Sequence, residues 1–278
     1  MSSYFDLYDE GRIALFSLQE GENDARLLLL WACEIDMTQL LAGYTVSSVP
    51  DEKVRRYRDA IQLRKSGVPL QYITHESNFC GLNLYVDENV LIPRFDTEIL
   101  VEKILTDNKE KDVSVLDLCT GSGCIAIALA KIGGYRHVYG SDISRNALEI
   151  ADANASSNGV EIVFFESDMF SELKGLKDLD IIVSNPPYIR TEVCGKLMTE
   201  VRDHEPRMAL DGDEDGLKFY RIIAAEAGKH LKRGGKLYLE IGYDQAEEVC
   251  DLLKNNSFNQ IEVIRDLSGL DRVVCSTI

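Results

Sequence analysis

The chain has 278 residues, of which 45% are hydrophobic and 28% are charged. This length and composition suit one α/β domain of ordinary size with a smaller partner domain, and they exclude a disordered chain. The formal net charge of −17 repels polyanions, which argues against duplex nucleic acid as a substrate, although a local basic groove can bind phosphates in an acidic protein.

The cysteines and the N-terminus indicate the cellular setting. The seven cysteines are an odd number, with no C-x-x-C pair and no histidine at metal-ligand spacing, which indicates reduced thiols and no metal site. The N-terminus has no basic start followed by an apolar run, and the longest apolar stretch, 27–33, is too short to cross a bilayer. We therefore expect a cytoplasmic protein with no membrane association.

The first 75 residues carry apolar side chains at spacings of three and four, which is typical of amphipathic helices. Pro50, followed by two acidic residues, is typical of a helix start. We predict a small helical bundle over 1–75. Residues 79–92 then alternate apolar and polar side chains around Gly81 and Asn83, which predicts a short hairpin within a linker, 76–95, between two domains.

From residue 113 onward, short β-branched runs alternate with helical periods. This alternation predicts an open parallel sheet with crossover helices, and so an α/β domain over 96–278. Helices are expected at 217–231 and 244–255, with a strand at 236–241 and a closing pair of strands after them.

A glycine-rich turn follows the first strand of this domain and contains Cys119, Thr120, Gly121, Ser122 and Gly123. Its glycines permit a ligand to approach the backbone, and the helix that follows offers unpaired N–H groups. The pattern also fits a nicotinamide dehydrogenase or a tight turn with no ligand.

Two acidic residues follow the next two strands. Asp142 comes about twenty residues after the glycines, where a carboxylate can bind both hydroxyls of a ribose. It could instead cap the following helix, as could Ser144. Asp168 is placed to accept a hydrogen bond from an adenine amino group, with Met169 and Phe170 flanking the base.

The sequence Asn185, Pro186, Pro187, Tyr188 directly follows the apolar strand 180–184, at the edge where open α/β sheets bind ligands. A dehydrogenase has no use for this tetrapeptide. A conjugated amide or amine is a poor nucleophile, so its N–H groups must be held and polarised. The side-chain oxygen of Asn185 and the carbonyl of a proline-locked residue are two fixed acceptors for those groups.

These acceptors predict in-line attack of the nitrogen on the methyl group of S-adenosylmethionine, without a metal or a covalent enzyme intermediate. Tyr188 would stack on the planar group, and no side chain stands out as the proton acceptor. We predict Asn185, Pro186 and Tyr188 as catalytic residues and the whole tetrapeptide as the substrate site. A plain turn is the alternative for the tetrapeptide alone, but its combination with the glycine loop and both acids favours a methyltransferase.

Over essentially its whole length the chain also resembles the bacterial release factor glutamine methyltransferases, the PrmC or HemK family. The segments that carry the resemblance are LIPRFDTE at 91–98, the loop 117–123, the tetrapeptide 185–188 and the stretch 205–217. It implies a class I methyltransferase, a Rossmann-like α/β fold with a seven-stranded sheet, behind an N-terminal helical domain that docks the substrate protein. The implied reaction methylates the glutamine of the Gly-Gly-Gln motif in peptide chain release factors at the side-chain nitrogen N5, leaving S-adenosylhomocysteine.

Site residues carry over from the resemblance as follows. Cofactor contacts fall on the loop from Cys119 to Gly123 and on Asp142, Met169 and Asn185, whereas Asp168 rests on the strand pattern alone. The chain departs from the family at Cys119, where glycine is usual, at Phe95, where proline is usual, and at Met169, which is often tryptophan.

Two other functions are compatible with parts of the pattern. A nucleic-acid methyltransferase acting on an exocyclic amine of adenine or cytosine would use the same acceptors, but it needs a basic face and a flipped base. A methyltransferase fold can also serve as an interaction scaffold. We expect neither, and we expect a monomer.

Overall fold

A computed structural model describes residues 2–43 and 48–278 and divides the chain into two compact units. Unit 1 comprises Met1–His75 together with Met198–His204, and unit 2 comprises Glu76–Leu197 together with Glu205–Ile278. In the described part of the chain, no helix is both long enough and apolar enough to span a membrane.

Unit 1 is helical, as the spacing of its apolar residues predicts. Its helices are α1 (Tyr4–Ala14), α2 (Gly21–Cys33), α3 (Met37–Gly43), α4 (Asp51–Lys65), α5 (Leu70–Thr74) and α10 (Thr199–His204). Helix α4 begins directly after Pro50, which is its N-cap. The core of the unit includes the fully buried side chain of Tyr57, whose hydroxyl donates to the carbonyl of Ala25 at 3.2 Å.

A buried ion pair connects three helices of unit 1. Arg64 on α4 is only 4% exposed. Its Nε lies 2.7 Å from Oδ2 of Asp24 on α2, and its terminal nitrogen lies 2.6 Å from Oε1 of Glu200 on α10. A helix 136 residues further along the chain is therefore held to the bundle by a charge-assisted contact.

Unit 2 contains the seven-stranded sheet, in the order β5-β4-β3-β6-β7-β9-β8. Its strands are β3 (Ser114–Leu118), β4 (His137–Asp142), β5 (Val163–Glu166), β6 (Leu179–Ser184), β7 (Leu231–Glu240), β8 (Asn259–Arg265) and β9 (Asp271–Thr277). The first five in this order are parallel, whereas β9 runs antiparallel to both of its neighbours. The predicted fold class is confirmed.

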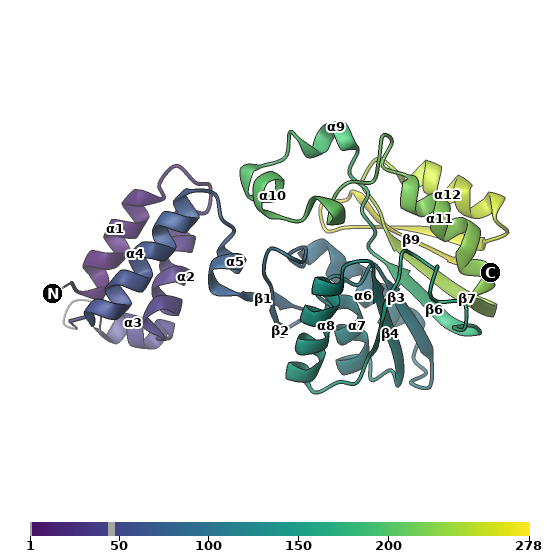
Figure 1. The fold of residues 1–278 in the computed structure, drawn as a ribbon, viewed down its shortest axis with the longest axis horizontal. Helices are drawn as coiled ribbons and strands as arrows, with labels where there is room; N and C mark the ends of the chain where they lie inside the picture. Colours follow the sequence, from purple (N-terminus) through teal and green to yellow (C-terminus); the bar gives the residue numbers. More distant parts are fainter. Residues whose placement is uncertain (1, 44–47) are drawn as a thin grey trace. The chain divides into compact units, whose positions relative to one another are not determined.

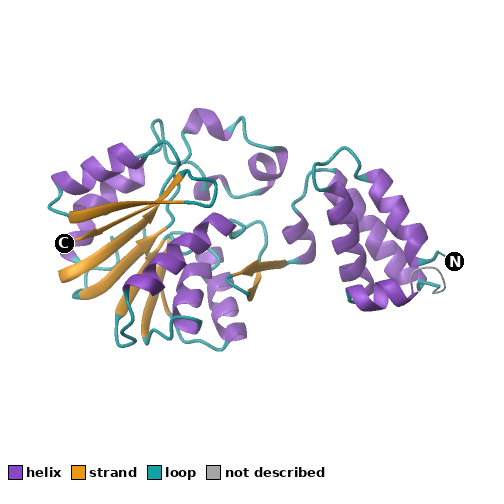
Figure 2. Cartoon of the chain, turned by 180° about the vertical axis from the view of Figure 1, so that it is seen from behind, coloured by secondary structure: helices purple, strands orange, loops and turns teal. Residues whose placement is uncertain are grey.

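Helices cover both faces of the sheet (Figures 1 and 2). They are α6 (Phe95–Asp107), α7 (Cys124–Lys131), α8 (Arg145–Asn158), α11 (Lys218–Glu226) and α12 (Ala246–Asn255). Unit 2 also contains the short helix α9 (Thr191–Cys194) and the 3₁₀ turns η1 (Arg207–Ala209) and η2 (Ala227–Lys229). Adjacent residues of β3 point to opposite faces: Val115 packs in the core beneath α6 and α7, and Leu116 in the core beneath α11 and α12.

Three predicted elements differ in extent. The strand predicted at 236–241 begins five residues earlier, because β7 spans Leu231–Glu240. The hairpin consists of β1 (Glu76–Phe79) and β2 (Leu82–Tyr85), so it ends at Tyr85 and not at residue 92. A turn follows, in which Asp87 accepts the N–H of Asn89. The predicted helix 217–231 ends at Glu226 and continues only as η2, because the chain must turn at His230 to enter β7 at Leu231.

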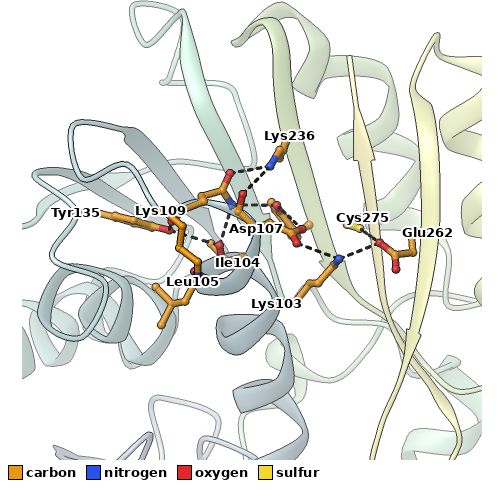
Figure 3. A network of polar contacts seen from close by, with 11 residues as sticks. Lys103, Ile104, Leu105, Asp107, Lys109, Tyr135, Lys236, Glu262 and Cys275 are labelled. Carbon is orange, nitrogen blue, oxygen red and sulfur yellow. Dashed lines mark hydrogen bonds and ion pairs between the residues drawn. The ribbon is translucent and has the colours of Figure 1, made fainter.

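A polar network fixes the C-terminal end of α6 to the sheet (Figure 3). Lys103 lies 3.1 Å from Asp107 and 2.9 Å from Glu262 on β8. On β7, Lys236 donates to the carbonyl of Asp107 at 3.2 Å, and the hydroxyl of Tyr238 donates to the Asp107 carboxylate at 3.0 Å. Lys236 and Tyr238 lie two apart and therefore on one face of β7, which Glu240 shares.

Candidate active site

A cavity of about 380 Å³ lies at the carboxyl ends of β3, β4, β5 and β6, within unit 2. This edge of a parallel sheet is where open α/β folds bind ligands, and the volume is typical of sites for small molecules. The walls contain most of the residues predicted for cofactor and substrate: Cys119, Thr120, Gly121, Ser122, Asp142, Asp168, Met169, Asn185 and Pro187.

The glycine loop presents its backbone to this cavity. At Gly121, where φ is +55°, a Cβ atom would lie in open space, so the residue leaves room for a ligand. Gly123, with φ of +81°, does not line the cavity and instead packs α7 against Ala151 on α8. Cys119 also has a left-handed backbone, with φ of +62°, which costs a residue with a side chain about 1–2 kcal/mol.

Asp142 links the glycine loop to the end of β4. Its Oδ2 accepts the N–H of Gly121 and its Oδ1 accepts the N–H of Ser144, both at 2.9 Å. The hydroxyl of Ser144, not Asp142, caps α8 by accepting the N–H of Ala147, so the capping interpretation of Asp142 is wrong. Burial raises the pKa of Asp142, and the backbone N–H groups of Ser144, Gly121 and Ile143 oppose that rise.

Asp168 and Met169 follow β5 and line the cavity. Met169 has a φ of +51°, and its sulfur lies 3.8 Å from that of Cys119. Phe170 does not reach the cavity, since its ring is buried against His230 with 4.8 Å between the centroids. Of the two side chains predicted to flank a base, Met169 is thus the one at the cavity wall.

The tetrapeptide after β6 contributes Asn185 and Pro187 to the cavity wall, whereas Pro186 and Tyr188 do not line it. The Nδ2 of Asn185 donates to the hydroxyl of Thr97 at 3.3 Å. The hydroxyl of the half-buried Tyr188 donates to Oε1 of Glu240 at 3.2 Å. Burial and the charge of Glu240 raise the pKa of Tyr188.

Glu240 and Thr97 also belong to this site, although neither was predicted as a site residue. Thr97 lies within the segment 91–98 that carries the family resemblance. Glu240 is the last residue of β7 and only 1% exposed, and its Oε2 accepts the hydroxyl proton of Thr97 at 2.6 Å. Burial raises the pKa of Glu240 to about 7, although Thr97 and the positive charge of Arg272 oppose the rise. For Glu240 the available signal was an acidic residue directly after the apolar residues 237–239 at the carboxyl end of β7.

The segment 91–98, which leads into the first turn of α6, has two separate roles. Arg94 lines the cavity and forms an ion pair with the buried carboxylate of Glu205. Glu98 points elsewhere and accepts the N–H of Cys80 in the hairpin turn at 2.8 Å. Of these two side chains, only that of Arg94 lines the cavity.

The residues of the cavity fit S-adenosylmethionine. The carboxylates of Asp142 and Asp168 can accept from hydroxyl and amino groups, and the space beside Gly121 accommodates a ligand chain. Val90, Ile143 and Met169 supply apolar surface for a planar base.

Comparison with known proteins agrees with this geometry. Residues 6–74 match the family model of the PrmC N-terminal domain, and residues 94–201 match that of the methyltransferase small domain. A solved structure of a methyltransferase from Pyrococcus furiosus is 18% identical, with a TM-score of 0.52 over 71% of this chain and 89% of its own, which shows the shared fold.

Full-length relatives identify the family. The release factor glutamine methyltransferase of Thermodesulfovibrio yellowstonii is 39% identical over 258 residues, which are 90% of this chain and 90% of the relative. That of Geobacter sulfurreducens is 40% identical over 260 residues, which are 92% of this chain and 90% of the relative. The chain belongs to the release factor glutamine methyltransferases, a family of S-adenosylmethionine-dependent enzymes.

Proposed function

We propose that the protein transfers the methyl group of S-adenosylmethionine to the side-chain amide nitrogen, N5, of the glutamine in the Gly-Gly-Gln motif of peptide chain release factors. The observation that carries this proposal is a shared cavity. Asn185 and Pro187 line the same cavity as the glycine loop, Asp142 and Asp168. A planar amide held at Asn185 would therefore meet a cofactor held by the loop.

The cofactor would be held by residues at the carboxyl ends of β3, β4 and β5, together with Asn185 after β6. Asp142 is proposed to bind the ribose hydroxyls and Asp168 the adenine amino group, with Met169 against the base. The loop from Cys119 to Gly123 would hold the rest of the molecule. When bound, S-adenosylmethionine supplies an electrophilic methyl carbon on a sulfonium sulfur.

The substrate amide would be held by two fixed acceptors. The Nδ2 of Asn185 donates to Thr97, which leaves its Oδ1 to accept one N–H of the glutamine. The carbonyl of Pro186 is proposed to accept the other, so that the nitrogen faces the methyl carbon. Tyr188 is half-buried, and the accessible part of its ring is proposed to stack on the amide.

The two units are proposed to divide the work. We propose that 1–75 docks the release factor, that 76–95 links the domains and that 96–278 carries out catalysis, in a monomer located in the cytoplasm. The hairpin is fastened within unit 2, because Asn154 of α8 accepts the N–H of Tyr85 at 2.7 Å and donates to its carbonyl at 3.0 Å.

The proposed function is tested by mass spectrometry of a release factor, a DNA duplex and an RNA pool after incubation with the enzyme and S-adenosylmethionine. We expect a gain of a single methyl group on the release factor, mapped to the glutamine of its Gly-Gly-Gln motif. A gain on nucleic acid alone would overturn the proposal and point to a base amine as the substrate.

The same assay examines Asn185 directly. In Asn185→Ala we expect methyl transfer to fall about 100-fold or more, as it does when a preorganised polar group is removed from a transition state. The affinity for S-adenosylmethionine should change by less than about 3-fold, because the carboxylates and the loop remain. Asn256→Ala, at the end of α12, is the matched control and should behave as wild type. Full activity in Asn185→Ala would refute the mechanism.

A further inference from the structure

A chain of hydrogen bonds runs from the buried end of β7 to the tetrapeptide. Thr97, on the first turn of α6, is 1% exposed, and its hydroxyl lies 2.6 Å from Oε2 of Glu240 and 3.3 Å from Nδ2 of Asn185. The three residues are far apart in sequence, and Thr97 and Glu240 are separated by 143 positions. The fold alone brings them together.

The chemistry of the three groups decides which of them donates and which accepts in each hydrogen bond. An ionised carboxylate can only accept, so the single hydroxyl proton of Thr97 must point to Glu240. The Thr97 oxygen is then left with lone pairs, and the group of Asn185 that can donate to them is its NH₂. An asparagine amide could otherwise present either end to a ligand, because its two ends have nearly the same shape.

We propose that Thr97 and Glu240 are positioning residues that orient the Asn185 side chain, so that its oxygen and not its nitrogen faces the substrate amide. The inference rests on the proposed function, because an oxygen is what the N–H groups of a glutamine require. A reversed Asn185 would place N–H against N–H and lose the acceptor. Thr97 and Glu240 themselves need not touch the substrate.

The hydrogen bonds from Asn185 through Thr97 to Glu240, called the relay from here on, orient Asn185 only while Glu240 is charged. The titratable groups that face it come from four elements and the loop after β6: Asp96 on α6, Cys124 on α7, Tyr220 on α11, Arg272 on β9, and Tyr188 in the loop. Arg272 favours the ionised form, whereas Asp96 and burial oppose it. If Glu240 gains a proton it can donate to Thr97, whose own proton can then turn to Asn185 and favour the reversed amide. The active orientation therefore belongs to the ionised carboxylate.

The first test compares Thr97→Val with Thr97→Ser in steady-state methylation of a release factor. Valine keeps the shape but removes the hydroxyl, so we expect kcat to fall about 10- to 100-fold, as for a misplaced catalytic group. The KM for the release factor and the affinity for S-adenosylmethionine, measured by calorimetry, should change by less than about 3-fold. Serine keeps the hydroxyl and should restore kcat to within about 3-fold of wild type.

Ser114→Ala is the matched control. Ser114 donates to the carboxylate of Asp180 at 2.8 Å, which is also a hydroxyl–carboxylate bond on this sheet but lies at the start of β3 and not at the cavity. Its kcat should be that of wild type. Wild-type kcat in Thr97→Val, or a loss that Thr97→Ser does not reverse, would overturn the relay.

The second test is the pH profile, which a merely structural role would not move. Wild-type kcat should fall on acidification with an apparent pKa near 7, and this limb should vanish in Glu240→Gln and in Thr97→Val. An acid limb that persists in both variants would overturn the relay while the proposed function stands. Failure of the wild-type enzyme to methylate any release factor would instead refute the proposed function, so the two failures are distinguishable.

Discussion

Asp117 is a second buried carboxyl group near the site, and its surroundings differ from those of Glu240. Its Oδ2 accepts the hydroxyl of Thr120 at 2.6 Å and the N–H of Ala126 at 3.2 Å. Its Oδ1 has no hydrogen-bond partner within the described parts of the chain. Burial raises the pKa of Asp117 to about 7, despite the bonds from Thr120 and Ala126, so this residue makes stability depend on pH.

The direction in which stability changes with pH follows from the difference between the pKa values of Asp117 in the folded and unfolded protein. Because the pKa of Asp117 is raised on folding, its contribution to stability is complete below about pH 4 and is lost as the pH rises through 7. We expect the free energy of unfolding, from urea titrations at pH 5, 6, 7 and 8, to fall by roughly 2–3 kcal/mol on this account. In Asp117→Asn that part of the fall should disappear, leaving the part due to Glu240. An unchanged slope would show that Asp117 does not titrate in this range.

At the residue scale, the sequence predicts what lies directly after a strand. Asp142, Asp168 and Asn185 each follow an apolar run, so their place at the sheet edge could be predicted, and all three line the cavity. Thr97 and Glu240 could not be found this way, because the contact that gives them meaning joins residues 143 positions apart. Local patterns contain no information on such a pair.

At the element scale, the strands and most helices of unit 2 could be predicted because each is an apolar run with one period, bounded by turn residues. The hairpin ends earlier than predicted because the alternation of polar and apolar residues continues past Tyr85 into a loop. Helix α10 could not be predicted as a part of unit 1, since nothing in the six residues Thr199–His204 indicates that Glu200 forms an ion pair with Arg64.

Arg64 offers a test of how firmly α10 and α2 are held to α4. Replacing Arg64 with Met leaves Asp24 buried without its counter-ion, which typically costs about 3–5 kcal/mol. We expect a loss of this size in the urea unfolding of unit 1, followed by the fluorescence of Trp31, which is the only tryptophan in the sequence.

The control lies on the same helix. Arg58 pairs with Glu10 at 2.8 Å, but both side chains are about half exposed, so Arg58→Met should cost less than about 1 kcal/mol. If the two variants lost equal free energy of unfolding, the burial of the Arg64–Asp24 pair would add nothing to the cost of removing its arginine. Adding Asp24→Leu to Arg64→Met should recover part of the loss, because the buried charge is then removed.

At the scale of the whole molecule, every residue that lines the cavity belongs to unit 2, whereas Trp31 belongs to unit 1. A ligand that binds only the folded state stabilises the unit that holds it, by about 2.7 kcal/mol at a concentration 100 times Kd. We expect S-adenosylmethionine to shift the unfolding transition seen by circular dichroism, and to leave the transition seen by Trp31 fluorescence in place. Equal shifts in both signals would mean that the two units unfold as one cooperative body.

The discontinuity of unit 1 has a consequence for synthesis on the ribosome. The last residue of its first segment is His75, but α10 is complete only at His204, about 130 residues later. At roughly 5–20 residues per second, the nascent bundle waits on the order of 6–26 s before Glu200 emerges to meet Arg64. During that interval, while the glycine loop and the tetrapeptide are being translated, the guanidinium of Arg64 has Asp24 as its acidic partner from the bundle but lacks the contact with Glu200.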